Sequence, residues 1–258
     1  MWSPRSGPVE WDAETYDVVS DPQFGWGMEV LERLALNGDE DAIDAGCGSG
    51  RVTAELAKRL PRGSILAVDA SEAMIVKARE RLGDRASYLV ADLAELEIAE
   101  PADLVFSTAT FHWIPDHERL FERLRTALRP GGRLVAQCGG RGNIREHAAV
   151  LAEVAVLPEF APHLGETPEL WNFAGPEETE ARLRAASFVN ARCWLEPKPV
   201  TPEDPLGFTM TSTLGAHLAR LPGPLRKPFA EAILDRSTKP FTLDYVRLNI
   251  EARVARSF

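Results

Sequence analysis

A glycine-rich loop between an apolar run and an amphipathic stretch constrains this chain more than any other feature. The loop reads DAGCGSG over residues 44–50, and it ends the apolar run 41–45. Glycine adopts backbone conformations that other residues avoid, so such a loop turns tightly from a strand into a helix and lets a ligand approach the backbone. Open α/β sheets bind ligands at the carboxyl ends of their strands. The loop therefore predicts both a fold and a binding edge.

The residues after the loop repeat this alternation of short apolar runs with helix-length amphipathic stretches. Such alternation is typical of strand–helix units around a parallel sheet. We predict strands over residues 41–45, 64–69, 86–91, 102–107, 133–137, 191–195 and 245–254, and helices that begin near Gly50, Ser71 and His117 or cover 177–186. The pattern predicts a Rossmann-like, doubly wound α/β fold with a mostly parallel seven-stranded sheet.

The second half of the chain has a different texture, because prolines interrupt the helix and strand patterns after Cys138. Proline-rich stretches favour short helices and loops. We expect the segments at about 140–175 and 203–240 to be helical cap insertions that fold over the ligand-binding edge of one domain spanning residues 41–258. Residues 1–40 are expected to form lid helices in front of it.

Composition narrows the choice of partner. The 258 residues carry 39 acidic and 29 basic side chains, a net charge of -10, which disfavours nucleic acid and anionic membranes and favours a small molecule. The three cysteines, Cys47, Cys138 and Cys193, have no CxxC spacing and predict reduced thiols, without a disulfide or zinc site. Neither a signal-peptide pattern nor a long apolar run occurs, so we expect a soluble, cytoplasmic protein.

A second acidic residue supports the binding edge. Asp69 ends the second predicted strand, where a carboxylate can accept hydrogen bonds from both hydroxyls of a ribose. A nicotinamide or flavin site is the obvious competitor, but its G-x-G-x-x-G spacing would require glycine at position 51, where Arg51 stands. The spacing therefore disfavours a dinucleotide.

The D-x-G-x-G-x-G loop resembles motif I of the class I S-adenosylmethionine-dependent methyltransferases. The resemblance continues through AVDASEAM at 67–74, VADL at 90–93 and FSTATFHW at 106–113, and covers about residues 11–140. The His112-Trp113 pair, WDAETYD at 11–17 and Pro22-Gln23 are most similar to the trans-aconitate methyltransferase-like group, whose members methylate carboxylates.

The resemblance implies S-adenosylmethionine as cofactor. It implies that Asp69 binds the ribose hydroxyls, that Asp92 binds the adenine amino group, and that Met74 and Leu93 pack beside adenine. The full cofactor-binding set that it implies is Tyr16, Gln23, Asp44, Ala45, Gly46, Cys47, Gly48, Asp69, Ala70, Met74, Ala91, Asp92, Leu93, Ser107 and Ala109.

The acceptor side is predicted from chemistry. Methyl transfer is an in-line displacement, and a carboxylate acceptor is already ionised at neutral pH, so positioning suffices and no general base is needed. His112 is the candidate catalytic residue; it could orient the acceptor, remove its proton or be structural. The predicted substrate-binding residues are Trp26, His112, Trp113, Arg141 and Asn143. Arg141 would pair with a carboxylate, and Arg247 is a weaker candidate for this role.

Three functions stay open at this point. The leading hypothesis is O-methylation of a small carboxylate, either trans-aconitate-like or more hydrophobic. An alternative is a C-, O- or N-methyltransferase of a secondary metabolite with His112 as base. A third hypothesis, from another class, is a non-catalytic S-adenosylmethionine-binding protein. We expect no metal, no nucleic acid or membrane partner, and a monomer or homodimer.

Overall fold

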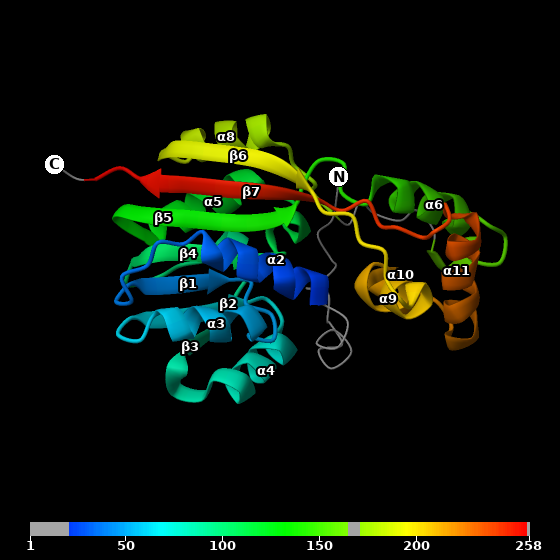
Figure 1. Cartoon of the computed structure of the whole chain (residues 1–258), viewed down its shortest axis with the longest axis horizontal. Helices are drawn as coiled ribbons and strands as arrows, with labels where there is room; N and C mark the ends of the chain where they lie inside the picture. The colour runs from blue at the N-terminus through cyan, green and yellow to red at the C-terminus, as the bar shows by residue number, and fades with distance from the viewer. Residues whose placement is uncertain (1–20, 165–170, 257–258) are drawn as a thin grey trace.

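The computed structural model describes residues 21–164 and 171–256, and its core is one seven-stranded sheet (Figure 1). The strands are β1 (Asp41–Ala45), β2 (Ser64–Asp69), β3 (Ser87–Val90), β4 (Ala102–Thr108), β5 (Leu128–Gly139), β6 (Phe188–Pro197) and β7 (Val246–Val254). Their order is β3-β2-β1-β4-β5-β7-β6. All neighbours among β1–β5 are parallel, and β7 is antiparallel to both β5 and β6. The predicted fold class is confirmed.

The helices complete a doubly wound arrangement. The α-helices are α2 (Asp21–Glu32), α3 (Arg51–Arg59), α4 (Glu72–Leu82), α5 (His117–Thr126), α6 (Arg145–Ala155), α7 (Ala161–Leu164), α8 (Pro176–Ala185), α9 (Pro205–Ser212), α10 (Gly215–Arg220) and α11 (Gly223–Arg236). Three short 3-10 helices are η1 (Gly83–Arg85), η2 (Leu93–Glu95) and η3 (Phe111–Trp113). One apolar cluster joins the sheet to α2, α3 and α4, and a second joins it to α5 and α8. Helices therefore cover both faces of the sheet.

Local sequence explains where these elements begin and end. Ser71 caps α4 by accepting the backbone N–H of Met74, and the Asp116 side chain caps α5 by accepting that of Arg119. The strand β5 begins earlier than the apolar run suggests, because Leu128 already pairs with Ala102 of β4. The register then shifts, since the next pair is Leu104 with Arg133, and the extra residues lie in β5. Gly131, at φ 83°, lets the chain pass this irregularity without ending the strand.

The strand order places a binding crevice at the centre of the sheet. From β1 the chain builds outward to β2 and β3, and it then returns to β4 on the other side of β1. Ligands bind such sheets where the order reverses, beyond the carboxyl ends of the strands. In Figure 1 the helices α6, α9, α10 and α11 lie beyond this same end of the sheet.

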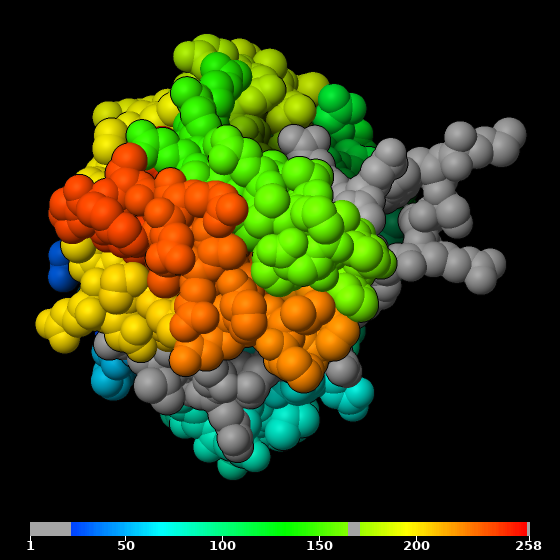
Figure 2. Space-filling model, turned by 90° about the vertical axis from the view of Figure 1, so that its right-hand side faces the viewer, coloured from blue at the N-terminus to red at the C-terminus, as the bar shows by residue number. Residues whose placement is uncertain are grey.

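The helices beyond the sheet have an apolar core of their own. Residues of α6 and α7, such as Val154 and Leu164, pack with Phe229 and Ile233 of α11 and with Leu218 of α10. Figure 2 looks onto this group, where the segment 145–164 lies against the segment 223–236. We call α6, α7, α9, α10 and α11 the cap. None of the described helices is long and apolar enough to cross a membrane.

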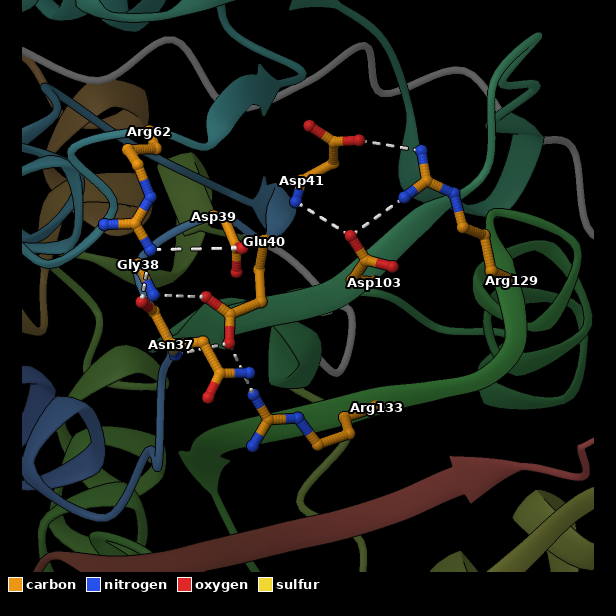
Figure 3. A network of polar contacts seen from close by, with 9 residues as sticks. All are labelled: Asn37, Gly38, Asp39, Glu40, Asp41, Arg62, Asp103, Arg129 and Arg133. Carbon is orange, nitrogen blue, oxygen red and sulfur yellow. Dashed lines mark hydrogen bonds and ion pairs between the residues drawn. The ribbon is translucent and has the colours of Figure 1, made fainter.

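A polar network fastens the opposite, amino end of the sheet (Figure 3). Arg129 of β5 bridges Asp41 of β1 and Asp103 of β4 at 2.7 and 2.8 Å. Beside them, the buried carboxylate of Glu40 accepts the backbone N–H groups of Asn37 and Gly38 at 2.7 and 2.9 Å. These contacts hold the central strands in register at the end away from the crevice.

Candidate active site

The glycine-rich loop is held to the end of β2. The backbone N–H groups of Gly46 and Cys47 both donate to the carbonyl of Val68, at 2.8 and 2.9 Å. Gly46 has φ +86°, and a Cβ there would lie 2.1 Å from Oγ1 of Thr110. Gly48 also has a positive φ, but a Cβ there would meet no atom within 4 Å. The loop is therefore packed against Thr110 at Gly46, and it has open space beside it at Gly48.

Asp69 lies against this loop. Its Oδ2 accepts the backbone N–H of Gly48 at 2.9 Å, and its Oδ1 accepts that of Ser71 at 2.9 Å. Burial raises the pKa of this carboxyl, an effect that the backbone N–H donors oppose. Because a carboxylate oxygen accepts more than one hydrogen bond, both oxygens keep capacity for hydroxyl donors of a ligand.

Asp44 is a buried residue whose side chain joins two elements of the domain. It is buried and accepts a hydrogen bond from the Thr53 hydroxyl at 2.6 Å, which ties β1 to α3. Burial, and to a smaller degree the nearby charge of Asp69, raises its pKa to about 7. Ser107 plays a comparable part, since its hydroxyl donates to the carbonyl of Ala45 at 2.6 Å. The bond of Asp44 holds β1 against α3, and the bond of Ser107 holds β4 against β1, beside the loop.

A hollow opens beside the loop, with about 480 Å³ of empty space including space open to solvent, and we call it the cofactor pocket. It is lined by Gln23, Phe24, Asp44, Gly46, Cys47, Gly48, Ser49, Arg51, Val52, Thr108 and Ala109. Of these, Phe24, Ser49, Arg51, Val52 and Thr108 were not predicted as site residues. The Arg51 guanidinium lies 4.7 Å from the centre of the Phe24 ring, a contact between α3 and α2 that no sequence motif marks.

The residues expected around adenine gather at the adjoining edge, next to Asp69. The backbone N–H of Ala91 donates to the Asp69 carbonyl at 3.0 Å. Asp92 is exposed and caps η2 by accepting the backbone N–H of Ala94 at 2.9 Å. Met74 and Leu93 are both buried, and Ala70 is exposed. None of these lines the hollow itself; Tyr16 lies outside the described residues.

A second hollow, with about 500 Å³ of empty space including space open to solvent, adjoins the first and reaches the cap; we call it the acceptor pocket. It is lined by Gln23, Ala109, His112, Trp113, Asn143, Ile144, Trp171, Phe173, Ser212, Thr213, Tyr245 and Arg247. Gln23 and Ala109 line both pockets, so the two hollows meet there. Ala109 has φ 57°, an uncommon conformation for alanine that turns the chain from β4 into η3 at this junction.

His112 is held as a neutral hydrogen-bond donor. The backbone N–H of Gly139 donates to its Nδ1 at 3.2 Å, so Nδ1 has no proton and the neutral ring carries it on Nε2. Burial, with the positive charge of Arg247 as a second cause, lowers the pKa of His112 well below 6.5. At neutral pH the imidazole therefore has no unengaged lone pair with which to take a proton.

Arg247 is the cation that the fold brings to this pocket. It lies on β7 opposite Gly139 of β5, is only 3% exposed, and has its guanidinium 4.8 Å from the centre of the Trp26 ring. Gly139 is thus the neighbour of both Arg247 and His112. Trp26 is buried behind Arg247 and, among the described contacts, does not line the hollow.

Arg141 has a different place from the one we predicted. Its guanidinium pairs with Glu177 and Glu178 at 3.6 and 3.2 Å, its side chain is 54% exposed, and it does not line the acceptor pocket. The first turn of α8 draws it away, since both glutamates belong to that turn. Asn143 does reach the pocket, and its Oδ1 accepts the backbone N–H of Val246 at 2.9 Å.

Aromatic side chains of the segment just before α8 complete the acceptor pocket. Trp171 and Phe173 are stacked with centroids 5.6 Å apart, and Phe173 also stacks on His112 at 5.8 Å. The sequence showed their aromatic character but gave them no assigned role, because they stand in an irregular segment without periodicity. Tyr245, Ser212 and Thr213 likewise had no motif that could have identified them.

The described residues show neither a reactive cysteine nor a metal-binding cluster. Burial raises the pKa of the Cys138 and Cys193 thiols to about 12 and that of Cys47 beyond its usual range. All three cysteines are buried free thiols, unsuited to act as nucleophiles. Within residues 21–164 and 171–256, no cluster of three or more His, Cys, Asp or Glu side chains could hold a metal ion.

Comparison with known proteins adds independent support. Residues 42–132 match the family model described as a methyltransferase domain. The chain is 33% identical over 187 residues to trans-aconitate 2-methyltransferase of Methylobacterium nodulans, covering 72% of this chain and 67% of that protein. A protein of the same name from Delftia acidovorans is 28% identical over 251 residues, covering 92% and 88%. In the proteins of that name from Afipia carboxidovorans and Variovorax paradoxus, the chain spans 62% and 60% of the length.

Solved structures agree in fold. Phosphoethanolamine N-methyltransferase 2 of Haemonchus contortus, in complex with S-adenosyl-L-methionine, matches with a TM-score of 0.60 at 20% identity, over 95% of this chain and 57% of that one. The [4+2]-cyclase SpnF matches with the same TM-score, 0.60, at 19% identity, over 99% and 86%. From the loop, the strand order and these relatives together, the chain is a member of the class I S-adenosylmethionine-dependent methyltransferases, in the trans-aconitate methyltransferase-like group.

Proposed function

We propose that this enzyme transfers the methyl group of S-adenosylmethionine to a carboxylate of a small-molecule acceptor and forms a methyl ester. The observation that carries the proposal is that a buried cation, Arg247, and a neutral N–H donor, His112, line the same pocket. That pocket meets the cofactor pocket at Ala109. The relatives named trans-aconitate 2-methyltransferase support it, since their name specifies an acid as the acceptor.

The described residues fit the cofactor. The space at Gly48 admits a ligand, and both oxygens of Asp69 can accept ribose hydroxyls. Oε1 of Gln23 is buried without a hydrogen-bond partner among the described residues, which suits an ammonium or amide donor of a ligand. When bound, S-adenosylmethionine supplies an electrophilic methyl group on a sulfonium. Asp92, Met74 and Leu93 would flank its adenine, as the resemblance to the family implies.

The acceptor side needs charge and positioning, without a base. A carboxylic acid has a pKa near 4, so it reaches the enzyme already as the nucleophile. Arg247 supplies the opposite charge, and Nε2–H of His112 supplies a neutral donor to the same group. These contacts engage one carboxylate oxygen and leave the other oxygen for the methyl carbon. The geometry of His112 disfavours the alternative in which it removes a proton from a neutral acceptor.

The proposal includes a role for the cap. Its Ser212 and Thr213 line the acceptor pocket, so the cap helices would exclude water from the transfer step. Of the lid helices predicted for residues 1–40, the described part is α2, and residues 1–20 lie outside the described ranges. A cytoplasmic location and a monomer or homodimer stay predictions.

The test compares two arginines. Purified protein with methyl-labelled S-adenosylmethionine and a panel of carboxylic acids should release labelled methanol on mild alkaline hydrolysis, as methyl esters do. We expect Arg247→Gln to raise the acceptor KM by roughly 30- to 100-fold, the equivalent of about 2–3 kcal/mol for a lost charged hydrogen bond. The matched control Arg141→Gln, at an exposed arginine, should stay within about twofold. The opposite ranking would support Arg141 as the substrate anchor instead.

The same assay separates a non-catalytic binding protein from an enzyme. Such a protein would bind S-adenosylmethionine in a calorimeter and give no labelled product with any acid, amine or phenol of the panel. Alkali-stable label on a phenol or amine would instead favour the secondary-metabolite alternative. Only alkali-labile label, formed from acids, supports the proposed function.

A further inference from the structure

We propose that the preferred acceptor is a monocarboxylic acid with a flat aromatic body and a hydrogen-bond donor at its far end. This inference rests on the proposed carboxylate methylation and specifies its substrate class. Three properties of the acceptor pocket carry it: its charge, its aromatic wall and the hydroxyl groups of the cap.

The charge of the pocket matches one carboxylate. Among the described residues that line it, Arg247 is the only cation, and His112 stays neutral. A carboxylate that leaves water without a charged or donor-rich partner costs several kcal/mol. One cation on the described lining pairs with one carboxylate, and further carboxylates of trans-aconitate would depend on neutral donors there.

The wall of the pocket suits a flat ring. Trp171 and Phe173 are nearly parallel, 12° apart, and the planes of Phe173 and His112 differ by 27°. Trp113 continues the wall, with its centroid 6.0 Å from that of Trp171. Aromatic side chains of this kind favour stacked or edge-on contact with another ring, and their carbon surface offers no ion pair to a charged, hydrated chain.

This wall is fixed before a ligand arrives. The backbone N–H of Asn172 donates to the carbonyl of His112 at 2.8 Å, and its side-chain amide donates to the carbonyl of Pro115 at 2.9 Å. These bonds tie the segment bearing Trp171 and Phe173 to η3. Binding to a preorganised surface costs little conformational entropy, so a rigid, planar acceptor binds to it most tightly.

The cap end of the pocket presents lone pairs. The Ser212 hydroxyl donates to the Phe208 carbonyl at 2.6 Å, and the Thr213 hydroxyl lies 3.1 Å from the Thr209 carbonyl and 2.9 Å from Nε2 of His147. A hydroxyl has a single proton, so what each offers the pocket is an acceptor. A phenolic O–H or indole N–H would bind there, whereas a second carboxylate would meet oxygen lone pairs.

The experiment measures binding separately from turnover. Protein saturated with S-adenosylhomocysteine is titrated in a calorimeter with trans-4-hydroxycinnamate, trans-cinnamate and trans-aconitate. We expect both aryl acids to bind at least 10-fold more tightly than trans-aconitate, and the hydroxylated one at least threefold more tightly than cinnamate. Labelled S-adenosylmethionine should then convert both aryl acids into methyl esters.

Two variants connect the result to the structure. Phe173→Ala should weaken both aryl acids at least 10-fold and leave the affinity for S-adenosylhomocysteine unchanged. The matched control Phe241→Ala removes a ring from the same apolar cluster that does not line the pocket, and should preserve the order of the three acids. Thr213→Val should abolish the preference for the hydroxylated acid over cinnamate.

The outcomes distinguish this inference from the proposed function. Tighter binding and faster esterification of trans-aconitate than of both aryl acids would overturn the inference and leave carboxylate methylation standing. Binding of the aryl acids without ester formation from any of the three would overturn the proposed function instead. Equal affinity of hydroxycinnamate and cinnamate would overturn the assignment of the cap hydroxyls as acceptors.

Discussion

The backbone N–H of Gly139 donates a hydrogen bond to Nδ1 of His112 across 3.2 Å. This bond joins the end of β5 to η3 and fixes the tautomer of a buried imidazole. It leaves the proton on Nε2, the nitrogen that can still donate. A histidine beside a methyl acceptor is easily taken for a base, and here a single backbone donor favours the opposite role.

The pH dependence of turnover follows from this arrangement. The pKa of His112 is lowered well below 6.5 by burial and by Arg247, so the ring stays neutral throughout pH 6–8. A carboxylate acceptor is also ionised over that range. We expect kcat, measured with both substrates saturating, to change less than about twofold between pH 6 and 8. A fall of kcat on acidification with an apparent pKa near 6.5 would instead identify a histidine base.

Substitution at His112 checks the same role. His112→Gln keeps a side-chain N–H donor, whereas His112→Leu removes it. We expect His112→Gln to retain at least 10-fold more kcat/KM than His112→Leu, because one hydrogen bond to a charged group contributes about 1.5–3 kcal/mol. Equal loss in the two variants, with melting temperatures unchanged, would contradict a donor role.

Asp69 is expected to dominate cofactor affinity. An amide in Asp69→Asn would turn an NH2 group toward either the Gly48 or the Ser71 backbone N–H and would lose the negative charge. We expect the Kd for S-adenosylmethionine in calorimetry to rise at least 10-fold. Asp84→Asn, at an exposed aspartate of η1, is the matched control and should bind normally.

Two glycines of the loop should respond differently to alanine. In Gly46→Ala the new Cβ would lie 2.1 Å from the Thr110 hydroxyl oxygen, so the loop must shift; we expect a loss of about 2 kcal/mol or more in the free energy of unfolding. In Gly48→Ala the methyl group enters open space. We expect stability there to change by about 1 kcal/mol, while cofactor affinity falls at least 10-fold. Thermal denaturation and calorimetry on both variants separate the two effects.

The sequence predicted the central strands because their apolar runs are short and sharply bounded, as at 41–45 and 64–69. It placed the start of β5 too late, since Pro130 and Gly131 look like the end of a helix and are instead accommodated within the strand. The larger difference concerns the substrate cation. Arg247 reaches the pocket only because β7 runs antiparallel beside β5, a long-range pairing that no local pattern encodes. Arg141, adjacent in sequence to a glycine turn, was the more visible candidate.

The polar network of Figure 3 predicts a change in stability without a change in binding. Glu40 is 8% exposed, and its carboxylate accepts two backbone N–H groups, so Glu40→Gln loses charged hydrogen bonds at the amino end of the sheet. We expect the free energy of unfolding in urea to fall by about 1–3 kcal/mol. The Kd for S-adenosylmethionine, measured by calorimetry, should stay within about twofold. A larger change would mean that the network reaches the crevice.

Two buried histidines should make the protein sensitive to mild acid. His147 and His217 in the cap are 4% and 2% exposed, and neither ring nitrogen of His217 has a hydrogen-bond partner among the described residues. Burial lowers the pKa of each from 6.5 to about 4, with His217 a further cause for His147 and Arg220 for His217. Between those values the unfolded chain binds protons at these two residues that the folded chain does not, so both histidines lower the stability as pH decreases from 6.5 toward 4.

The expected loss between pH 6.5 and 5 is roughly 2 kcal/mol for each histidine. Urea denaturation at pH 7.5, 6.5, 5.5 and 5 measures it, above the range in which the lowered pKa of Glu40 adds its own loss. His217→Phe removes one of the two groups and keeps a ring beside Phe229, on which His217 stacks with centroids 6.3 Å apart. Compared with the unsubstituted protein, this variant should lose roughly 2 kcal/mol less stability between pH 6.5 and 5. The other groups with shifted pKa values, among them His112, His117 and Asp44, contribute equally in both proteins. An unchanged slope would mean that His217 has the same pKa in the folded and the unfolded chain, because only a group that binds the proton equally in both states drops out of the pH dependence.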